Sequence, residues 1–386
     1  PDLSNRVEHF CLIFPSRKIH NVTEINAEDL KQVLTFSNEV MSSDYGLEDD
    51  FAYNFLPGSY ENGKESLFAI QHSTDDGTLY GRLNFSDALN VPMKFSGSCD
   101  FQKPSQNLVN AYKTVNGLPE FSDYNKADYN ANTDKVDPRL YHTVALPGVP
   151  YKYDKKNIFD ESWTRNKAVY GLYSSLKENV ALNDPSSVLI DPFRANTKNK
   201  IVIRYADVVL MAAEAYNEIN DTPKAWELLN DVRARAHATE INSSNYASLM
   251  KAPKVYDLPF ISDGDEAGKF RTALYWERAF ETAYEGQRKF DLIRWGVLGD
   301  ALRAAQTYIE GWEEGANLFK DVDKNGKPTK LEEGESPAVW DPVVWATQNY
   351  VAGHNFVDGK HELLPIPLAE IQSNAQLNGE NNPGYE

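Results

Sequence analysis

Cysteine is almost absent from this sequence, which has two, Cys11 and Cys99, among 386 residues. Neither lies in the closely spaced pattern that a zinc site or a CxxC redox pair requires. The two allow one disulfide and require none. The cysteine content therefore predicts neither a structural zinc site nor a thiol–disulfide active site.

Basic residues are also scarce. The chain has 39 Lys and Arg against 57 Asp and Glu, which gives a formal net charge of −18. Proteins that bind nucleic acid neutralise its phosphates with clustered Lys and Arg. An acidic chain has no such excess to offer, so we expect no nucleic-acid partner.

Long apolar runs and familiar catalytic motifs are missing as well. No run approaches the roughly 20 apolar residues that a membrane helix needs, and Cys11 follows Glu8 and His9 where a lipoprotein signal would be apolar. We expect this chain to carry no anchor of its own. No GxSxG, P-loop or GxGxxG pattern occurs, and His361-Glu362 lacks the second histidine of a zinc-protease helix. With 41% hydrophobic residues, the chain is expected to be globular and soluble.

The most informative stretch runs from Ala273 to Gly296 and has the pattern of one strongly charged helix. Residues three or four apart share a helix face. Aromatic and apolar residues occupy the other stripe, as in a helix held between neighbours. Gly286 interrupts the pattern, which we interpret as a point of close packing. The predicted opposite-charge neighbours are Arg278 with Glu281, Glu285 with Arg288, and Asp291 with Arg294.

Glu281 and Glu285 lie four residues apart on this predicted helix. Two carboxyl groups on one face could flank a glycosidic bond as the acid and the base of a glycoside hydrolase. A general acid needs a raised pKa, whereas neighbouring guanidinium groups favour the ionised carboxylate and lower its pKa. The sequence therefore favours a structural role for both, and glycoside hydrolysis is kept as an alternative.

Several short blocks follow one another along the chain: Asp137–Leu140, Arg204–Val208, Leu229–Ala236, Glu277-Arg278, Tyr284–Arg288, Phe290–Gly296, and Leu363–Pro367 running to Asn382–Tyr385. In residues and order they closely resemble the signature of the SusD/RagB family, surface lipoproteins that bind nutrients for import across the outer membrane. The resemblance extends from about residue 28 to the C-terminus. Family members begin with a lipid-modified cysteine and a helical region, so the resemblance implies that an N-terminal part is missing from this sequence.

The resemblance implies a mainly α, SusD-like fold, in which tetratricopeptide-type helix pairs accompany a loop-rich irregular region and short β-hairpins. The residue patterns agree with this. Asn26 can cap a helix that has Glu28 and Asp29 in its first turn, and Thr222 with Pro223 can begin the second helix of a pair. We predict a single domain over residues 1–386, with a helical scaffold at 23–45, 201–240 and 270–305, a loop-rich ligand region at 80–200 and a C-terminal tail at 360–386.

Aromatic residues are concentrated between Phe121 and Tyr173, where ten occur in 53 residues with little regular periodicity. Tyr and Trp present flat apolar faces that can cover the C–H side of a sugar ring, while Asn, Asp and Arg reach its hydroxyls. The alternative is that these rings form a small core beneath long loops. The ligand-binding candidates are Trp163, Tyr151, Tyr153, Tyr129 and Tyr124.

One segment has the pattern of a calcium-binding EF-hand loop, with oxygen ligands at alternate positions, a glycine and a closing glutamate. Pro328 takes the place of an expected apolar residue, and the segment after the loop has no helical pattern. An Asn-Gly hairpin turn is therefore favoured over a calcium site. No metal or cofactor is predicted, and the weaker calcium candidates are Asp321, Asp323, Asn325 and Glu332.

The resemblance implies a function that this chain would perform without catalysis. It would bind an oligosaccharide or polysaccharide at the extracellular face of the outer membrane and deliver it to a SusC-like TonB-dependent transporter. Its link to the membrane would be an N-terminal lipid anchor that this sequence does not contain. The alternatives are a peptide-binding member of the family, a glycoside hydrolase, and a tetratricopeptide-type scaffold for protein partners.

Overall fold

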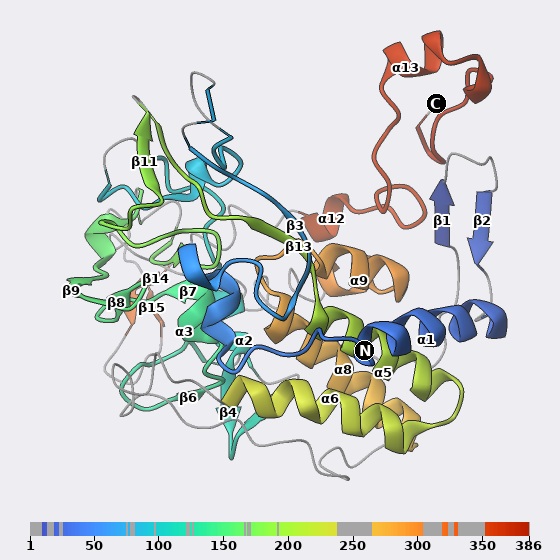
Figure 1. The fold of residues 1–386 in the computed structure, drawn as a ribbon, viewed down its shortest axis with the longest axis horizontal. Coiled ribbons are helices and arrows are strands. Elements are labelled where there is room, and N and C mark those ends of the chain that lie inside the picture. The colour runs from blue at the N-terminus through green and yellow to red at the C-terminus, as the bar shows by residue number, and fades with distance from the viewer. Residues whose placement is uncertain are drawn as a thin grey trace.

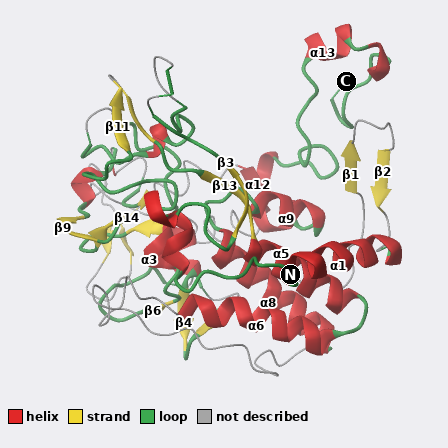
Figure 2. Ribbon diagram, viewed as in Figure 1, coloured by secondary structure: helices red, strands yellow, loops and turns green. Residues whose placement is uncertain are grey.

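The structure of the protein, a computed structural model, describes the following residues: 10–13, 19–22, 26–74, 76–77, 82–95, 98–120, 124–125, 127–165, 167, 171–190, 193–237, 265–303, 319–322, 328–330 and 352–385. Within these ranges the longer helices gather on one side of the molecule, and short strands and loops make up the other (Figures 1 and 2). None of the described helices is both long and apolar enough to span a membrane.

Among the described residues, the helical side contains α1 (Ala27–Met41), α5 (Tyr205–Glu218), α6 (Thr222–His237), α8 (Glu266–Thr282) and α9 (Arg288–Arg294). Asn26 caps α1 as predicted, because its side chain accepts a hydrogen bond from the amide of Glu28 at 2.9 Å. Helix α5 lies at the centre and packs against α1, α6 and α8. Small buried residues such as Ala212 and Ala213 allow this close approach.

Helices α5 and α6 form the predicted helix pair, joined by a link in which Asn220 has a left-handed φ of +68°. The prediction of a mainly α fold with helix pairs and short hairpins is confirmed. One boundary of the predicted helical scaffold differs. Residues 200–204 are a strand, not the first turn of the scaffold helix, because Ile201 and Ile203 pair with a neighbouring strand.

The strands are short and pair antiparallel. One three-stranded sheet places β4 (Lys113–Val115) between β5 (Leu118–Pro119) and β6 (Lys135–Val136). The two-stranded pairs are β1 (Phe10–Ile13) with β2 (Ile19–Val22), β3 (Ser66–Ile70) with β13 (Lys200–Arg204), β7 (Val144–Ala145) with β10 (Ser174–Ser175), β8 (Pro150–Tyr151) with β9 (Asp154–Ile158), β11 (Ser187–Ile190) with β12 (Phe193–Asn196), and β14 (Phe319–Val322) with β15 (Pro328–Lys330).

Short helices complete the described chain: α2 (Gln106–Ala111), α3 (Leu140–Thr143), α12 (Ala352–Asn355), α13 (Leu368–Ser373), and the 3₁₀ turns η2 (Phe51–Phe55), η3 (Gly58–Tyr60), η4 (Ala88–Asn90), η6 (Glu161–Trp163) and η7 (Ala375–Leu377). In the loop-rich part, buried apolar residues form separate small clusters beneath the loops. Helix α13 lies apart from the helical side in the C-terminal tail (Figure 1).

The predicted continuous helix from Ala273 to Gly296 is broken. Helix α8 ends at Thr282 and α9 begins at Arg288. In between, Tyr284 and Gly286 both have left-handed φ angles, +66° and +87°. Nothing lies within 4 Å of a Cβ built on Gly286. Our interpretation of this glycine as a close-packing residue is therefore wrong, because what the position requires is a backbone conformation.

The substitution Gly286→Ala should lower the free energy of unfolding by about 1–2 kcal/mol, because an L residue is strained at left-handed φ. Gly46→Ala is the matched control. Its Cβ would also meet nothing within 4 Å, and its φ is not left-handed, so we expect a change between zero and a gain of about 1 kcal/mol. Urea unfolding of both variants measures the difference. Equal effects would mean that backbone conformation is not what Gly286 supplies.

Candidate ligand pocket and the buried ion network

Two of the five predicted ligand residues lie inside a small core in the loop-rich part. Trp163 is 5% exposed and Tyr151 is 1% exposed, and their ring centroids are 5.8 Å apart. Phe95 and Phe159 pack against both rings, with centroids 5.4–6.3 Å away. These two rings therefore lie in a small core beneath the loops, which was the alternative to a ligand platform. Because both are buried, neither has an open face for a sugar.

The other three predicted residues are partly exposed and lie elsewhere. Tyr153 and Tyr129 border a second buried cluster, and Tyr124 packs edge-on against Trp276 at 5.3 Å. The hydroxyl of Tyr153 is 2.7 Å from Nδ1 of His142. The structure therefore brings Tyr151 and Trp163 together, and does not gather all five residues on one surface.

The turn that carries Tyr153 has an unusual backbone. Lys152 and Tyr153 connect β8 to β9, and both have left-handed φ angles, where Asn-Gly is the common choice. Tertiary contacts hold this turn. The buried Lys152 ammonium donates to the carbonyl oxygens of Phe55 at 3.1 Å and Leu176 at 2.8 Å. Lys152 thus connects the β8–β9 hairpin to η2, which contains Phe55, and to the loop that contains Leu176.

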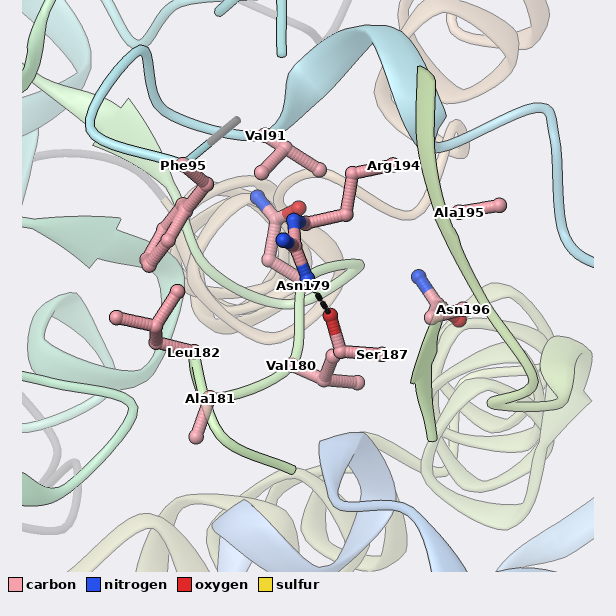
Figure 3. Close-up of a pocket in the computed structure, with 10 residues that line it drawn as sticks. All are labelled: Val91, Phe95, Asn179, Val180, Ala181, Leu182, Ser187, Arg194, Ala195 and Asn196. Atoms are coloured by element: carbon pink, nitrogen blue, oxygen red, sulfur yellow. Dashed lines mark hydrogen bonds between the residues drawn. The ribbon is translucent and has the colours of Figure 1, made fainter. Parts of the chain in front are cut away.

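A pocket opens beside the core that contains Trp163 and Tyr151. Val91, Phe95 and Leu182 of that core form one side of it, and the β11–β12 hairpin forms the other side (Figure 3). The space measures about 250 Å³, part of it open to solvent. Pockets for drug-sized ligands typically hold about 300–1,000 Å³. The part of this space that a water-sized sphere can enter is little larger than one water molecule.

The register of the hairpin places three of its pocket-lining residues, Ser187, Arg194 and Asn196, on one face, while Ala195, which also borders the pocket, packs in the small core on the other face. Val188 pairs with Ala195, and both pack on Leu83 and Ala88 in a separate small core. Side chains alternate between the two faces of a strand, so the flanking pairs share the opposite face. These are Ser187 with Asn196 and Leu189 with Arg194. Nη1 of Arg194 donates to the hydroxyl of Ser187 at 3.0 Å.

Asn179 lies between the two sides of the pocket (Figure 3) and is 1% exposed. Its Nδ2 donates to the carbonyl oxygens of Ser175 at 3.0 Å and Asn90 at 3.3 Å. Its Oδ1 is buried and accepts no hydrogen bond. A buried amide oxygen without a donor costs about 1–3 kcal/mol, so Asn179 is the polar group of this pocket that has most to gain from a ligand.

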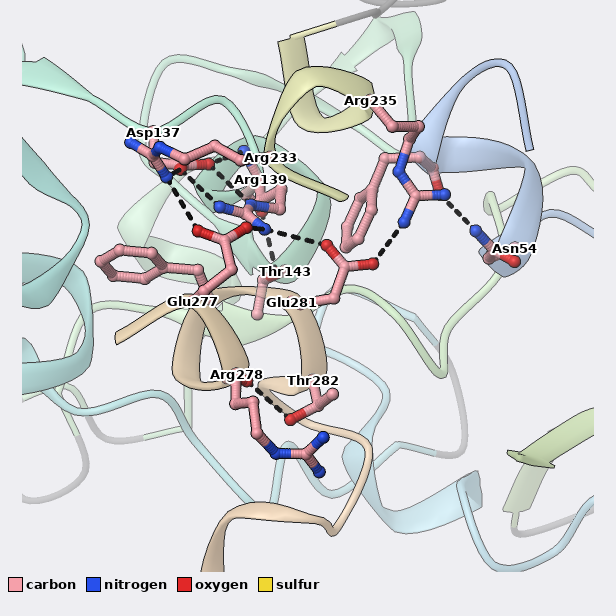
Figure 4. Close-up of polar contacts among 12 residues, drawn as sticks. Asn54, Asp137, Arg139, Thr143, Arg233, Arg235, Glu277, Arg278, Glu281 and Thr282 are labelled. Atoms are coloured by element: carbon pink, nitrogen blue, oxygen red, sulfur yellow. Dashed lines mark hydrogen bonds and ion pairs between the residues drawn. The ribbon is translucent and has the colours of Figure 1, made fainter. Parts of the chain in front are cut away.

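Glu281 and Glu285 lie in a different place, inside a buried network of ion pairs beneath α8. Figure 4 shows Glu281 among its arginine partners Arg139 and Arg235. Glu281 is fully buried and binds Arg139 at 2.9 Å, Arg204 at 2.7 Å, and Arg235. Glu285 binds Arg204 at 2.6 Å and Lys177 at 2.6 Å. Both carboxylates are therefore saturated by cations and do not face an open cleft.

The network is electrically neutral. Its five cations are Arg139, Arg204, Arg233, Arg235 and Lys177, and its five anions are Glu65, Asp137, Glu277, Glu281 and Glu285. Because these charges cancel, the net charge of −18 resides entirely outside the network. Buried charges are tolerated only when they are paired and hydrogen-bonded.

The carboxyl groups of Glu281 and Glu285 both have lowered pKa values. Burial alone would raise the pKa of Glu281, but Arg235, Arg204 and Arg139 outweigh it and hold the pKa far below its usual range. Burial alone would also raise the pKa of Glu285, but the charges of Arg204 and Lys177 outweigh it and lower the pKa of that carboxyl. A general acid needs the opposite shift. This is the direction that the arginine-rich sequence predicted.

The partners of these charges differ from the predicted ones. Of the three neighbouring pairs, one is confirmed, Asp291 with Arg294 at 2.9 Å. Arg278 binds Asp207 and Asp291 and does not bind Glu281. Arg288 makes no ion pair with Glu285, because the helix is broken between them. Its guanidinium stacks on the ring of Tyr275 at 3.9 Å.

No cluster of metal-ligating side chains occurs among the described residues. Of the calcium candidates, Asp323, Asn325 and Glu332 lie outside the described residues, and Asp321 belongs to β14. The pairing of β14 with β15 agrees with the hairpin alternative. Cys99 is half-buried and forms no disulfide.

The profile of the SusD family matches residues 64–385. The chain belongs to the SusD family. Two curated relatives from Formosa agariphila are similar to this SusD-family chain. SusD-like protein P25 is 41% identical over 108 residues, 28% of this chain and 17% of the relative. SusD-like protein P38 is 25% identical over 264 residues, 67% of this chain and 44% of the relative.

Solved structures show the same fold. A SusD homolog from Bacteroides thetaiotaomicron has a TM-score of 0.59 at 22% identity, over 93% of this chain and 60% of that one. A SusD superfamily protein from Bacteroides vulgatus has a TM-score of 0.56 at 20% identity, over 93% of this chain and 59% of that one. This SusD-family chain thus spans less than half of the two curated relatives and about three fifths of these structures.

The substitution Glu281→Gln should lower the free energy of unfolding by about 3–5 kcal/mol, because it leaves three buried guanidinium groups short of a carboxylate. Glu227→Gln is the control. It removes the same charge from an exposed pair with Lys224, where we expect a loss below about 1 kcal/mol. Urea unfolding at neutral pH compares them. A small effect at Glu281 would contradict the structural role of the network.

Stability should also depend on His142 between pH 6.5 and 5. Burial, followed by Lys177, Lys152 and Arg235, lowers the pKa of His142 from 6.5 to about 3. Below pH 6.5 the unfolded chain binds a proton that the folded chain does not, so stability falls as the pH drops. The loss from this residue is about 2 kcal/mol at pH 5.

The variant His142→Asn should show a flatter stability profile than the natural chain over this range, measured by urea unfolding at several pH values. The paired carboxylates with lowered pKa values lose their contribution only below their ordinary pKa of about 4.5. Buried carboxyl groups with raised pKa values, such as Asp100, Asp128 and Glu178, are present in both proteins, so the difference between the two profiles isolates the histidine. Parallel profiles for the two proteins would contradict the assignment.

Proposed function

We propose that this SusD-family protein binds an oligosaccharide or polysaccharide without cleaving it and delivers it to a SusC-like TonB-dependent transporter. The protein would act at the extracellular face of the outer membrane, held there by an N-terminal lipid anchor. The observation that carries the proposal is the family match over residues 64–385.

Carbohydrate as the cargo is supported by one of the similar structures. A protein from Bacteroides fragilis described as a SusD-like carbohydrate binding protein has a TM-score of 0.50 at 21% identity, over 84% of this chain and 61% of that one. The architecture of this chain suits such a role, because a rigid helical side supports a loop-rich side with a pocket and partly exposed tyrosines.

The absence of catalysis is supported by the state of the strongest candidate acids. Glu281 and Glu285 are held as carboxylates by arginine and lysine, and so lack the raised pKa of a general acid. We therefore infer that the protein binds and releases its cargo without cleaving it. Partly exposed rings such as Tyr124, Tyr129 and Tyr153 contribute about 0.5–1.5 kcal/mol each beyond their buried area. Affinity of about 1 mM corresponds to about 4 kcal/mol, which suits a protein that must release its cargo.

The test is an array of polysaccharides and peptides probed with the purified protein, followed by a reducing-sugar assay on every glycan that is retained. We expect weak retention of at least one glycan and no release of reducing ends. Retention of peptides alone would replace glycan with peptide as the cargo. Release of reducing ends that disappears in Glu281→Gln would establish the hydrolase alternative instead. Binding to proteins alone would indicate a scaffold.

A further inference from the structure

We infer that the pocket beside Asn179 receives the exocyclic hydroxymethyl group of a hexose in the captured glycan. The inference rests on the proposed function, because it names the sugar chemistry that the binding protein would select. The residues that line this pocket belong to none of the motifs recognised in the sequence.

The size of the pocket limits what can enter. The inner part, defined as the space that a water-sized sphere can enter, is little larger than one water molecule, and the wider space of about 250 Å³ is partly open. A complete sugar ring is too large for the inner part. A hydroxymethyl arm, which consists of one carbon and one oxygen beyond the ring, is one heavy atom larger than a water molecule. The ring itself would lie across the mouth of the pocket.

The polarity of the pocket matches the two ends of such an arm. Val91, Phe95 and Leu182 form an apolar side for its methylene group. The buried Oδ1 of Asn179 accepts no hydrogen bond and would accept one from the hydroxyl. Two hydrogen bonds from Nδ2, to the carbonyl oxygens of Ser175 and Asn90, fix the amide so that this oxygen is an acceptor.

The apolar side of the pocket is held rigidly from behind. Phe95 lines the pocket and packs on Tyr151 at 5.4 Å and on Trp163 at 5.7 Å. These two predicted ligand residues would therefore act as positioning residues that support the pocket wall. A rigid wall favours one shape of ligand, because close-packed interiors adjust little.

This geometry implies a rule of specificity. A pentose lacks the arm, and a 6-deoxyhexose has a methyl group that cannot donate to Asn179. Both would leave the amide oxygen without a donor, which costs about 1–3 kcal/mol, or about 5-fold to 150-fold in affinity. Hexoses should therefore bind better than sugars that differ only at this position.

Saturation-transfer NMR on pairs of free sugars tests the inference. The pairs are D-glucose with D-xylose, D-galactose with L-arabinose, and D-mannose with D-lyxose, and 6-deoxy-D-glucose is added to the first pair. We expect at least one hexose to show transfer to its C6 protons and to exceed its pentose partner at least 5-fold. Equal transfer within every pair, or no transfer to any hexose, would overturn the inference.

The substitution Ala181→Leu provides the second arm, because Ala181 is half-buried and lines the pocket, so that a larger side chain fills the space without removing a polar contact. It should abolish the hexose preference. Ala267→Leu, at a half-buried alanine of α8, is the control and should keep it. If Ala181→Leu lowers the Tm, the smaller Ala181→Val replaces it. A preference that survives the filled pocket would place the hexose contact elsewhere.

The outcomes also separate this inference from the proposed function. If the protein retains polysaccharides on the array but does not distinguish hexose from pentose, the pocket assignment fails and glycan binding stands. If it retains no polysaccharide and no hexose, both fail.

Discussion

Ten buried charges that cancel one another are the constraint on which the rest of this structure depends. They come from segments that are far apart in the sequence: Glu65 before β3, Asp137 and Arg139 before α3, Lys177 in a loop, Arg204 at the end of β13, Arg233 and Arg235 on α6, and three glutamates on or just after α8. Since a buried charge is stable only with its partners in place, these segments must assemble together. The network thereby joins the helical side to the loop-rich side.

This constraint clarifies how a protein with so much irregular chain can present a defined pocket. The loops have little hydrogen-bonded secondary structure of their own, so their positions depend on tertiary contacts. Lys177 binds Glu285 in the network, and two residues further along the chain Asn179 lines the pocket. The buried Lys152 holds the β8–β9 turn to the carbonyl oxygen of Leu176. The ion network and the pocket therefore share one short segment, residues 176–179. Contacts that fix this segment in the network also fix the position of Asn179 in the pocket.

Features that depend on neighbouring residues could be predicted from the sequence. The cap at Asn26, the start of α6 at Thr222 and the pairing of α5 with α6 all follow from local patterns. The family blocks indicated the fold, since they lie in its order along the chain. The break after Thr282 escaped prediction, because a helical pattern of charges continues through a backbone turn that only the φ angles reveal.

Features that depend on distant residues could not be predicted in the same way. Arg278 binds Asp207, which is 71 positions away in the sequence, and does not bind Glu281, which is three positions away. Trp163 and Tyr151 had the composition of a sugar platform, but the sequence does not say which face of a loop is buried. Asn179 carried no signal at all, because the unbonded position of its buried oxygen arises from the meeting of η4, a loop and the β11–β12 hairpin.

The cancellation of charge in the interior has a consequence for the outside of the molecule. All of the −18 excess lies on the remaining residues, so copies of the protein repel one another whenever their surfaces approach. In physiological salt this repulsion is screened beyond about 8 Å, so it acts only when two molecules come close together. Crowded molecules would then stay separate and dispersed even where the loops expose apolar side chains such as Phe85 and Phe101.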